Sequence, residues 1–152
     1  MADRTARDIM TPDPVTTTRD VGVTEAAKLM VEHDVGALPV IDDGRLVGLV
    51  TEDDLIHQDV KLEYPTYIQL LDGYFMYPPA EARFENELRK AVAATVGDVM
   101  TEKVISIQAD ASVEDVATLL VEKEVSHLPV LEGETLVGIV SKHDVVRSLV
   151  EE

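Results

Sequence analysis

The sequence predicts a mixed α/β (α+β) fold made of two pseudo-symmetric β-α-β-β-α units in tandem. When the chain is shifted by 90 positions, residues 8–56 align with residues 98–146 without a gap, and 18 of the 49 aligned pairs are identical. A supersecondary unit of about 50 residues rarely buries its apolar face alone. The two copies are therefore expected to pack against each other and to form two related clefts.

The elements follow in the same order in each copy. A short extended segment, at 15–17 or 105–107, precedes an amphipathic helix with apolar residues at i, i+3, i+4 and i+7. Two apolar strands follow, joined by a tight turn that contains Gly44 in the first copy and Gly133 in the second. A closing helix begins at Thr51 or Ser141. The predicted helix faces are Val23, Ala26, Ala27 and Met30 in the first copy and Val113, Val116, Ala117 and Leu120 in the second.

The two copies are separated by an insertion, which gives the predicted organisation 1–56, 57–96 and 97–152. The first half of the insertion is broken by proline and glycine, and its second half, 80–94, is predicted to be helical. In a solvated linker each aromatic ring would expose a large apolar area, so the insertion is expected to pack against the repeats or a partner subunit. It contains all the aromatic residues of the chain: Tyr64, Tyr67, Tyr74, Phe75, Tyr77 and Phe84.

Composition excludes several classes of protein. The 152 residues contain no cysteine, which rules out disulfides, thiolate zinc sites and a cysteine nucleophile. Thirteen Lys and Arg against thirty Asp and Glu give a net charge of -17, which disfavours nucleic acid and anionic lipid as partners. The acid excess indicates a soluble surface or, alternatively, adaptation to high salt. No apolar run suits a membrane span and the N-terminus lacks a signal-peptide core, so a cytoplasmic location is expected.

The repeated motifs resemble those of the CBS domain. Each copy has Asp-x-Met-Thr near its start, Leu-Pro-Val in the middle and Gly-x-Val-(Thr/Ser)-x-x-Asp at its end. Together they resemble a CBS pair, or Bateman module. The resemblance implies an adenosine-containing ligand (AMP, ADP, ATP or S-adenosylmethionine) in the clefts between the repeats. It also implies a homodimer and a regulatory role, with the binding state passed to an effector protein.

The closing motif carries the residues that the resemblance assigns to the ligand. In the family pattern the Asp holds the ribose hydroxyls and the Thr or Ser helps with phosphate, which implies Thr51 with Asp54 and Ser141 with Asp144. A carboxylate can accept two hydrogen bonds from a vicinal diol, and a helix N-terminus offers free N–H groups to an anion. The same spacing is also typical of a capping box, in which these side chains satisfy their own helix backbone.

The resemblance also implies which residues hold adenine. The expected walls are Met10, Val15, Val35, Gly36 and Ala37 for the cleft of Asp144, and Met100, Ile105, Val125 and Ser126 for the cleft of Asp54. Most of these residues are apolar, so ordinary core packing is the alternative interpretation.

The two copies differ in charge where a phosphate would lie. His127 takes a position that resembles a phosphate-facing basic residue, and its counterpart in the first copy is Ala37. The closing motif is Ser-Lys-His-Asp in the second copy and Thr-Glu-Asp-Asp in the first. A phosphate is expected to prefer the cleft of Asp144, because a carboxylate beside a phosphate is unfavourable in a partly desolvated site. Alternatively, these charged side chains all point into water on an exposed turn.

Catalysis finds no support in the motifs. The sequence has no Ser-His-Asp or paired-carboxylate pattern, no histidines at metal-site spacing and no glycine-rich phosphate loop. We therefore expect a binding module that is not an enzyme, with no catalytic residue and no metal. The alternative is an interaction protein without a ligand that uses the aromatic insertion as its surface, and the presence of both Asp54 and Asp144 argues against it.

Overall fold

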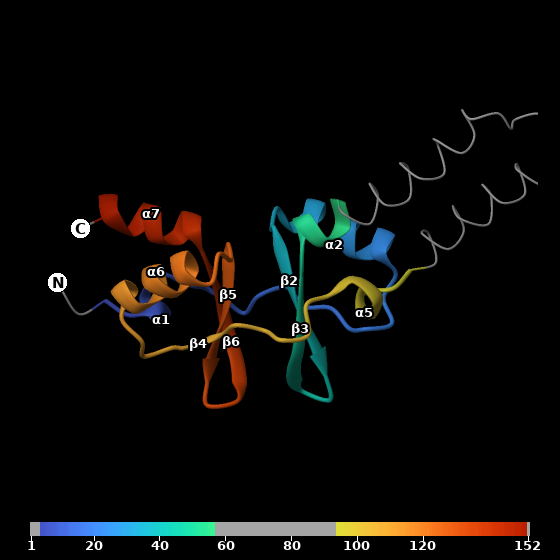
Figure 1. Ribbon diagram of the computed structural model, residues 1–152, viewed down its shortest axis with the longest axis horizontal. Helices are drawn as coiled ribbons and strands as arrows, with labels where there is room; N and C mark the ends of the chain where they lie inside the picture. Colours follow the sequence, from blue (N-terminus) through green and yellow to red (C-terminus); the bar gives the residue numbers. More distant parts are fainter. Residues whose placement is uncertain (1–3, 57–93, 152) are drawn as a thin grey trace, which may run out of the picture.

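The computed structural model describes residues 4–56 and 94–151. It confirms the predicted α+β architecture: two lobes lie side by side, each built from a β-hairpin with helices packed against it (Figure 1). Residues 57–93, which contain the six aromatic residues and nearly all of the predicted helix 80–94, lie outside the described residues. In the part of the chain that is described, no helix combines the length and the apolar character needed to cross a bilayer.

The first lobe forms around the hairpin of the first repeat. Its elements are α2 (Val23–His33), β2 (Ala37–Asp42) and β3 (Arg45–Thr51), and residues 52–56 begin the closing helix. The predicted face of α2 buries Ala26 and Met30 against β2 and β3. The hairpin turns at Asp43 and Gly44, whose φ angles of 53° and 79° are those of a type I′ turn and match the twist of the strands.

The second lobe repeats this arrangement. Its elements are β4 (Ile107–Gln108), α6 (Val113–Glu122), β5 (His127–Glu132), β6 (Thr135–Ser141) and α7 (Lys142–Val150). Strand β4 pairs in parallel with β5. It begins at Ile107, two residues after the start of the extended segment predicted at 105–107. In the first lobe the equivalent pairing is a single bridge between Thr17 and Val40. The extended segments are therefore shorter than predicted, because only these residues reach the edge of the hairpin.

The N-terminal segment of each repeat crosses to the opposite lobe, which the sequence did not predict. Helix α1 (Ala6–Ile9) packs against α6, α7 and β6, and β1 (Thr11–Pro12) pairs antiparallel with β6. In return α5 (Val96–Val99) buries Val96 in the core of the first lobe. Figure 1 shows the exchange, with blue α1 beside the orange and red helices and yellow α5 beside the hairpin of β2 and β3. Each lobe is therefore completed by the other repeat.

Two glycines allow the crossing segments to lie directly on the hairpins. A Cβ atom at Gly138 would overlap Sδ of Met10 and lie 2.8 Å from the carbonyl oxygen of Thr11. A Cβ atom at Gly48 would lie 2.5 Å and 3.1 Å from the equivalent atoms of the other crossing segment. Any larger residue must therefore push the segment away from the strand.

Alanine at Gly138 is expected to destabilise the protein more than alanine at Gly48, because the added Cβ atom lies 2.8 Å from the rigid backbone oxygen of Thr11 at Gly138 and 3.1 Å from that of Thr101 at Gly48. Overpacking of this kind costs about 1–3 kcal/mol in the free energy of unfolding, which urea denaturation would measure. The control is Gly22→Ser, which introduces the residue found at the equivalent position 112 into open space. A Gly138→Ala variant as stable as the unaltered protein would contradict this account of the crossing.

Candidate functional site

A cavity of about 440 Å³, here called cleft 1, opens between the two lobes. Ser141 and Asp144 at the start of α7 form one side, and residues 35–37 of the first lobe form the other. Thr11 and residues 13–15 of the crossing segment also line the cavity. Its lining residues are Thr11, Asp13, Pro14, Val15, His33, Asp34, Val35, Gly36, Ala37, His127, Ile139, Ser141, His143, Asp144 and Arg147.

Cleft 1 brings together all but one of the residues that the resemblance assigned to ribose, phosphate and adenine there. The exception is Met10, whose side chain lies against Gly138 and packs on the core of the second lobe. Sequence reasoning also missed His33, at the end of α2, and Arg147, one turn after Asp144 in α7. The i, i+3 spacing of Asp144 and Arg147 on one helix face was a usable signal for the second of these.

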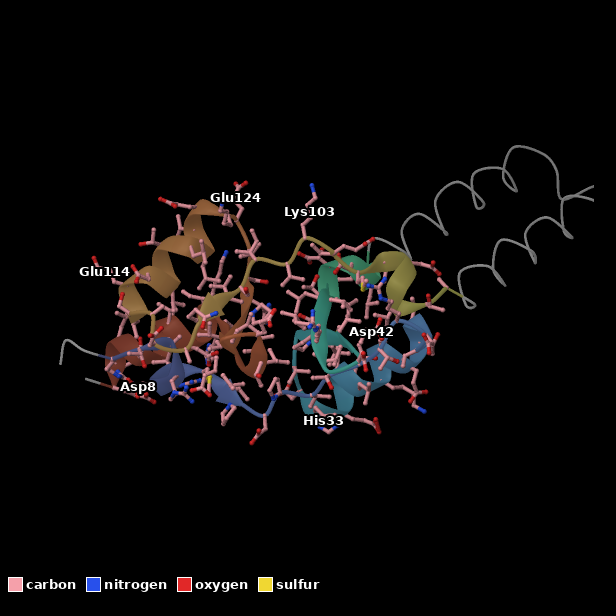
Figure 2. All side chains as sticks on the ribbon, turned by 90° about the horizontal axis from the view of Figure 1, so that it is seen from below. Asp8, His33, Asp42, Lys103, Glu114 and Glu124 are labelled. Atoms are coloured by element: carbon pink, nitrogen blue, oxygen red, sulfur yellow. The ribbon has the colours of Figure 1, made fainter. Side chains whose placement is uncertain are left out.

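A smaller cavity of about 220 Å³, cleft 2, lies at the equivalent place around Asp54. Met100, expected as a wall, is instead buried in the core of the first lobe for the same reason as Met10. In Figure 2, His33 of cleft 1 and Lys103 and Glu124 of cleft 2 lie at opposite edges of the molecule. The residues that line cleft 2 are Leu49, Thr51, Asp53, Asp54, Thr101, Lys103, Val104, Ile105, Glu124, Val125, Ser126 and His127.

Both closing motifs form capping boxes at the starts of their helices. Oδ2 of Asp144 accepts hydrogen bonds from the backbone N–H of Ser141 at 2.8 Å and from its hydroxyl at 3.1 Å. Oδ2 of Asp54 accepts the same two bonds from Thr51, at 2.8 Å and 3.2 Å. The capping interpretation therefore holds for one oxygen of each carboxylate. The other oxygen, Oδ1, is not used by the cap.

His127 lines both clefts and lies at the boundary between the lobes. Its Nδ1 is 2.9 Å from the hydroxyl of Ser126, and its ring lies against Gly36, where a Cβ atom would approach Cε1 to 3.3 Å. Burial lowers the pKa of His127, and the nearby carboxylates of Glu52 and Asp144 offset this only in part. The ring is therefore neutral at pH 7 and offers a hydrogen bond rather than a positive charge.

The sequence-based expectation that the clefts differ in charge is not met by their linings, since each contains three acidic side chains and one Lys or Arg, and cleft 1 differs by its two additional histidines, His33 and His143. Lys142 is exposed and lies outside the lining of cleft 1, whereas His143 lines it. The fixed positive charge of cleft 1 comes from Arg147, and that of cleft 2 from Lys103. Within residues 4–56 and 94–151, no three His, Cys, Asp or Glu side chains are grouped so that they would hold a metal ion.

Comparison with known families agrees with this architecture. The family model of the CBS domain matches residues 6–61 and residues 96–151. The chain belongs to the CBS domain family. Its two repeats form a CBS pair, and the clefts described above lie between the two CBS domains.

Similar proteins match almost the whole of this chain. The uncharacterized protein MJ1426 of Methanocaldococcus jannaschii is 30% identical over 152 residues, which cover 95% of this chain and 90% of the relative. The crystal structure of CBSX2 in complex with AMP is 30% identical, with a TM-score of 0.73 over 97% of each chain. The CBS pair of protein MJ0100, solved with 5′-methylthioadenosine and S-adenosyl-L-methionine, is 26% identical, with a TM-score of 0.70 over 97% of this chain and 96% of that one.

The partial burial of His127 is expected to make the stability of this CBS pair depend on pH. Because the folded-state pKa lies below the unfolded value of about 6.5, unfolding takes up a proton as the pH falls below that value. Stability is therefore expected to be full above pH about 6.5 and to fall until the folded-state pKa is passed.

His127→Gln is expected to reduce the change in the free energy of unfolding between pH 7.5 and pH 5.5, as measured by urea denaturation at both values. Ordinary carboxyl groups titrate below this range, so they contribute little to the change. The matched control is His143→Gln, since His143 is exposed. An unchanged slope in the His127 variant would show that its protonation is not linked to folding.

Proposed function

We propose that this CBS pair is a regulatory sensor that binds an adenosine-containing ligand in its two clefts. The observation that carries the proposal is the placement of Asp54 and Asp144, which occupy equivalent positions in the repeats and each line a cleft. Related CBS pairs provide support, since CBSX2 was solved with AMP and the pair of MJ0100 with two adenosyl compounds. A cytoplasmic location, where adenine nucleotides are abundant, fits this role.

The chemistry of each cleft suits the parts of such a ligand. Oδ1 of the aspartate is the acceptor for a ribose hydroxyl, because Oδ2 caps the helix. The aliphatic walls, such as Val15 and Val35 in cleft 1, suit the flat faces of adenine. The N-terminus of α7 and the side chain of Arg147 attract a phosphate at the same cleft.

Ligand binding would act on the arrangement of the two lobes. Each cleft is lined by residues from both repeats, so a bound ligand joins them and favours one relative arrangement over others. An effector protein that distinguishes these arrangements would read the binding state. CBS pairs generally act in this regulatory way, and the lining residues suit binding rather than catalysis, so we assign this chain no enzymatic role.

We further propose that the module forms a homodimer through apolar side chains on its helices. Ile56 and Val146 occupy equivalent positions in the two repeats and are 57% and 58% exposed. Leu149 and Val150 extend the exposed surface along α7, at 68% and 82%. Such surfaces mark interaction sites. A second copy fits because apolar groups at matching positions of a pseudo-symmetric unit can be covered together across one two-fold axis.

Asparagine at Asp144 is expected to weaken adenosyl binding in cleft 1, and asparagine at Asp54 in cleft 2. Asn is chosen because its amide oxygen can still accept the capping hydrogen bonds of Ser141 or Thr51, which alanine would remove. Loss of the charge-assisted bond to ribose is worth about 1.5–3 kcal/mol, or about a tenfold or larger fall in affinity. Titration calorimetry with AMP and S-adenosylmethionine would measure it, and undiminished binding in the double variant would refute the ribose role.

Serine at both Val146 and Leu149 is expected to convert a dimer into a monomer, because it removes apolar area that only a partner can bury. Light scattering would then report a mass near 16.7 kDa instead of twice that value. Lys123→Ser, on the exposed end of α6, serves as the control. If the unaltered protein is already a monomer, the homodimer proposal fails.

A further inference from the structure

Arg147 binds the carboxylate oxygen that a ribose hydroxyl would use in cleft 1. Its Nη2 atom donates a hydrogen bond to Oδ1 of Asp144 at 2.8 Å, while Oδ2 accepts the two capping bonds from Ser141. Asp144 is only 6% exposed, so water contributes little to its solvation. Both side chains line the cavity. Asp144 is thus held in an ion pair with a donor on each of its oxygens.

Cleft 2 differs at this point. Oδ2 of Asp54 makes the same two capping bonds with Thr51, and no described residue donates a hydrogen bond to its Oδ1. The position equivalent to Arg147 is His57, which lies outside the described residues. Lys103 lines cleft 2, and no ion pair joins it to Asp54 among the residues described.

We propose that the Asp144–Arg147 ion pair makes cleft 1 selective for phosphorylated over unphosphorylated adenosine ligands. This inference rests on the proposed function and names the ligand class of one of its two sites. A ribose hydroxyl that binds Oδ1 competes with the guanidinium for that oxygen, and in this proposal the guanidinium leaves it. An uncharged nucleoside has no anionic group to bind Arg147. Separating a partly buried ion pair is costly when the guanidinium gains no new anionic partner.

A phosphorylated ligand avoids that cost because it supplies the replacement partner. The guanidinium fork binds phosphate oxygens bidentately, so the ligand exchanges one charge-assisted pair for another as its ribose takes Oδ1. Selectivity then comes from penalising the wrong ligand as well as from attracting the right one.

The other contacts of Arg147 do not remove the penalty. Its Nε lies 3.7 Å from Oε2 of Glu151, whose side chain is 54% exposed, and an exposed pair of this kind contributes little. Its Nη2 is also 3.5 Å from the carbonyl oxygen of Ile9, at the outer limit of a hydrogen bond. The side chain of Arg147 is itself 43% exposed, which gives it room to turn from Asp144 toward a bound phosphate.

The test compares AMP with adenosine by titration calorimetry in an Asp54→Asn background, so that cleft 1 gives the signal. Arg147→Met is expected to lower AMP affinity about tenfold or more and to raise adenosine affinity, because both the phosphate partner and the competitor for Oδ1 are lost. Lys28→Met, on the exposed side of α2 and outside both clefts, removes the same charge and should leave both affinities unchanged. Arg147→Lys should keep a preference for AMP and show a smaller gain for adenosine.

Each other result overturns the inference. Weaker AMP binding with unchanged adenosine binding would mean that Arg147 only attracts phosphate, and a parallel loss of both ligands with a lower melting temperature would assign it a structural role. If Arg147→Met does not fold, an unchanged adenosine affinity in Arg147→Lys decides against the exchange. If the Asp54→Asn protein with Arg147 intact binds neither ligand, the proposed function fails at cleft 1 as well, and this outcome is distinct from the others.

Discussion

The close contact between each crossing segment and the opposite hairpin is the constraint on which the rest of the structure depends. The backbone of residues 11–12 pairs with β6, and Thr101 pairs with Leu49 of β3, with glycine at the point of closest approach in both lobes. These contacts hold the two hairpins together, and the clefts exist only because the lobes are held at that separation. The segment that leads out of one crossing, residues 11–15, also lines cleft 1.

The Thr/Ser-x-x-Asp pattern shows how one piece of local chemistry takes different roles by position. The same hydrogen bonds cap α1, through Thr5 and Asp8, and α5, through Thr95 and Asp98. Those carboxylates lie on short helices that belong to the crossing segments, and neither lines cleft 1 or cleft 2. The carboxylates at the starts of the closing helices make the same caps but face a cavity. Capping and ligand binding are therefore compatible roles, since each uses a different oxygen.

Sequence reasoning found what depends on local pattern and missed what depends on long-range placement. The helix faces and both hairpins follow from periodicity, turn chemistry and the repeat itself, and most cleft walls follow from the resemblance to the CBS domain. The exchange of N-terminal segments was not visible, because in two similar repeats each segment matches either lobe equally well. Met10 and Met100 were assigned to the clefts by the resemblance to the CBS domain, and the structure places both on the hairpins instead. The lowered pKa of His127 was also beyond the sequence, since it depends on burial between the lobes.

The asymmetry of the two clefts originates at the boundary between the lobes. His127 fits there because Gly36 opposite it has no side chain, whereas the equivalent pair in the alignment is Ala37 with Ser126. The boundary is not symmetric, because a large ring faces glycine at one position and two small residues, Ala37 and Ser126, stand at the equivalent position. The backbone of both repeats stays the same. Since His127 lines both cavities, a ligand that moves its ring alters the wall of the other cleft as well. This pair of residues thus removes the symmetry at the boundary and at the same time gives the two clefts a shared wall.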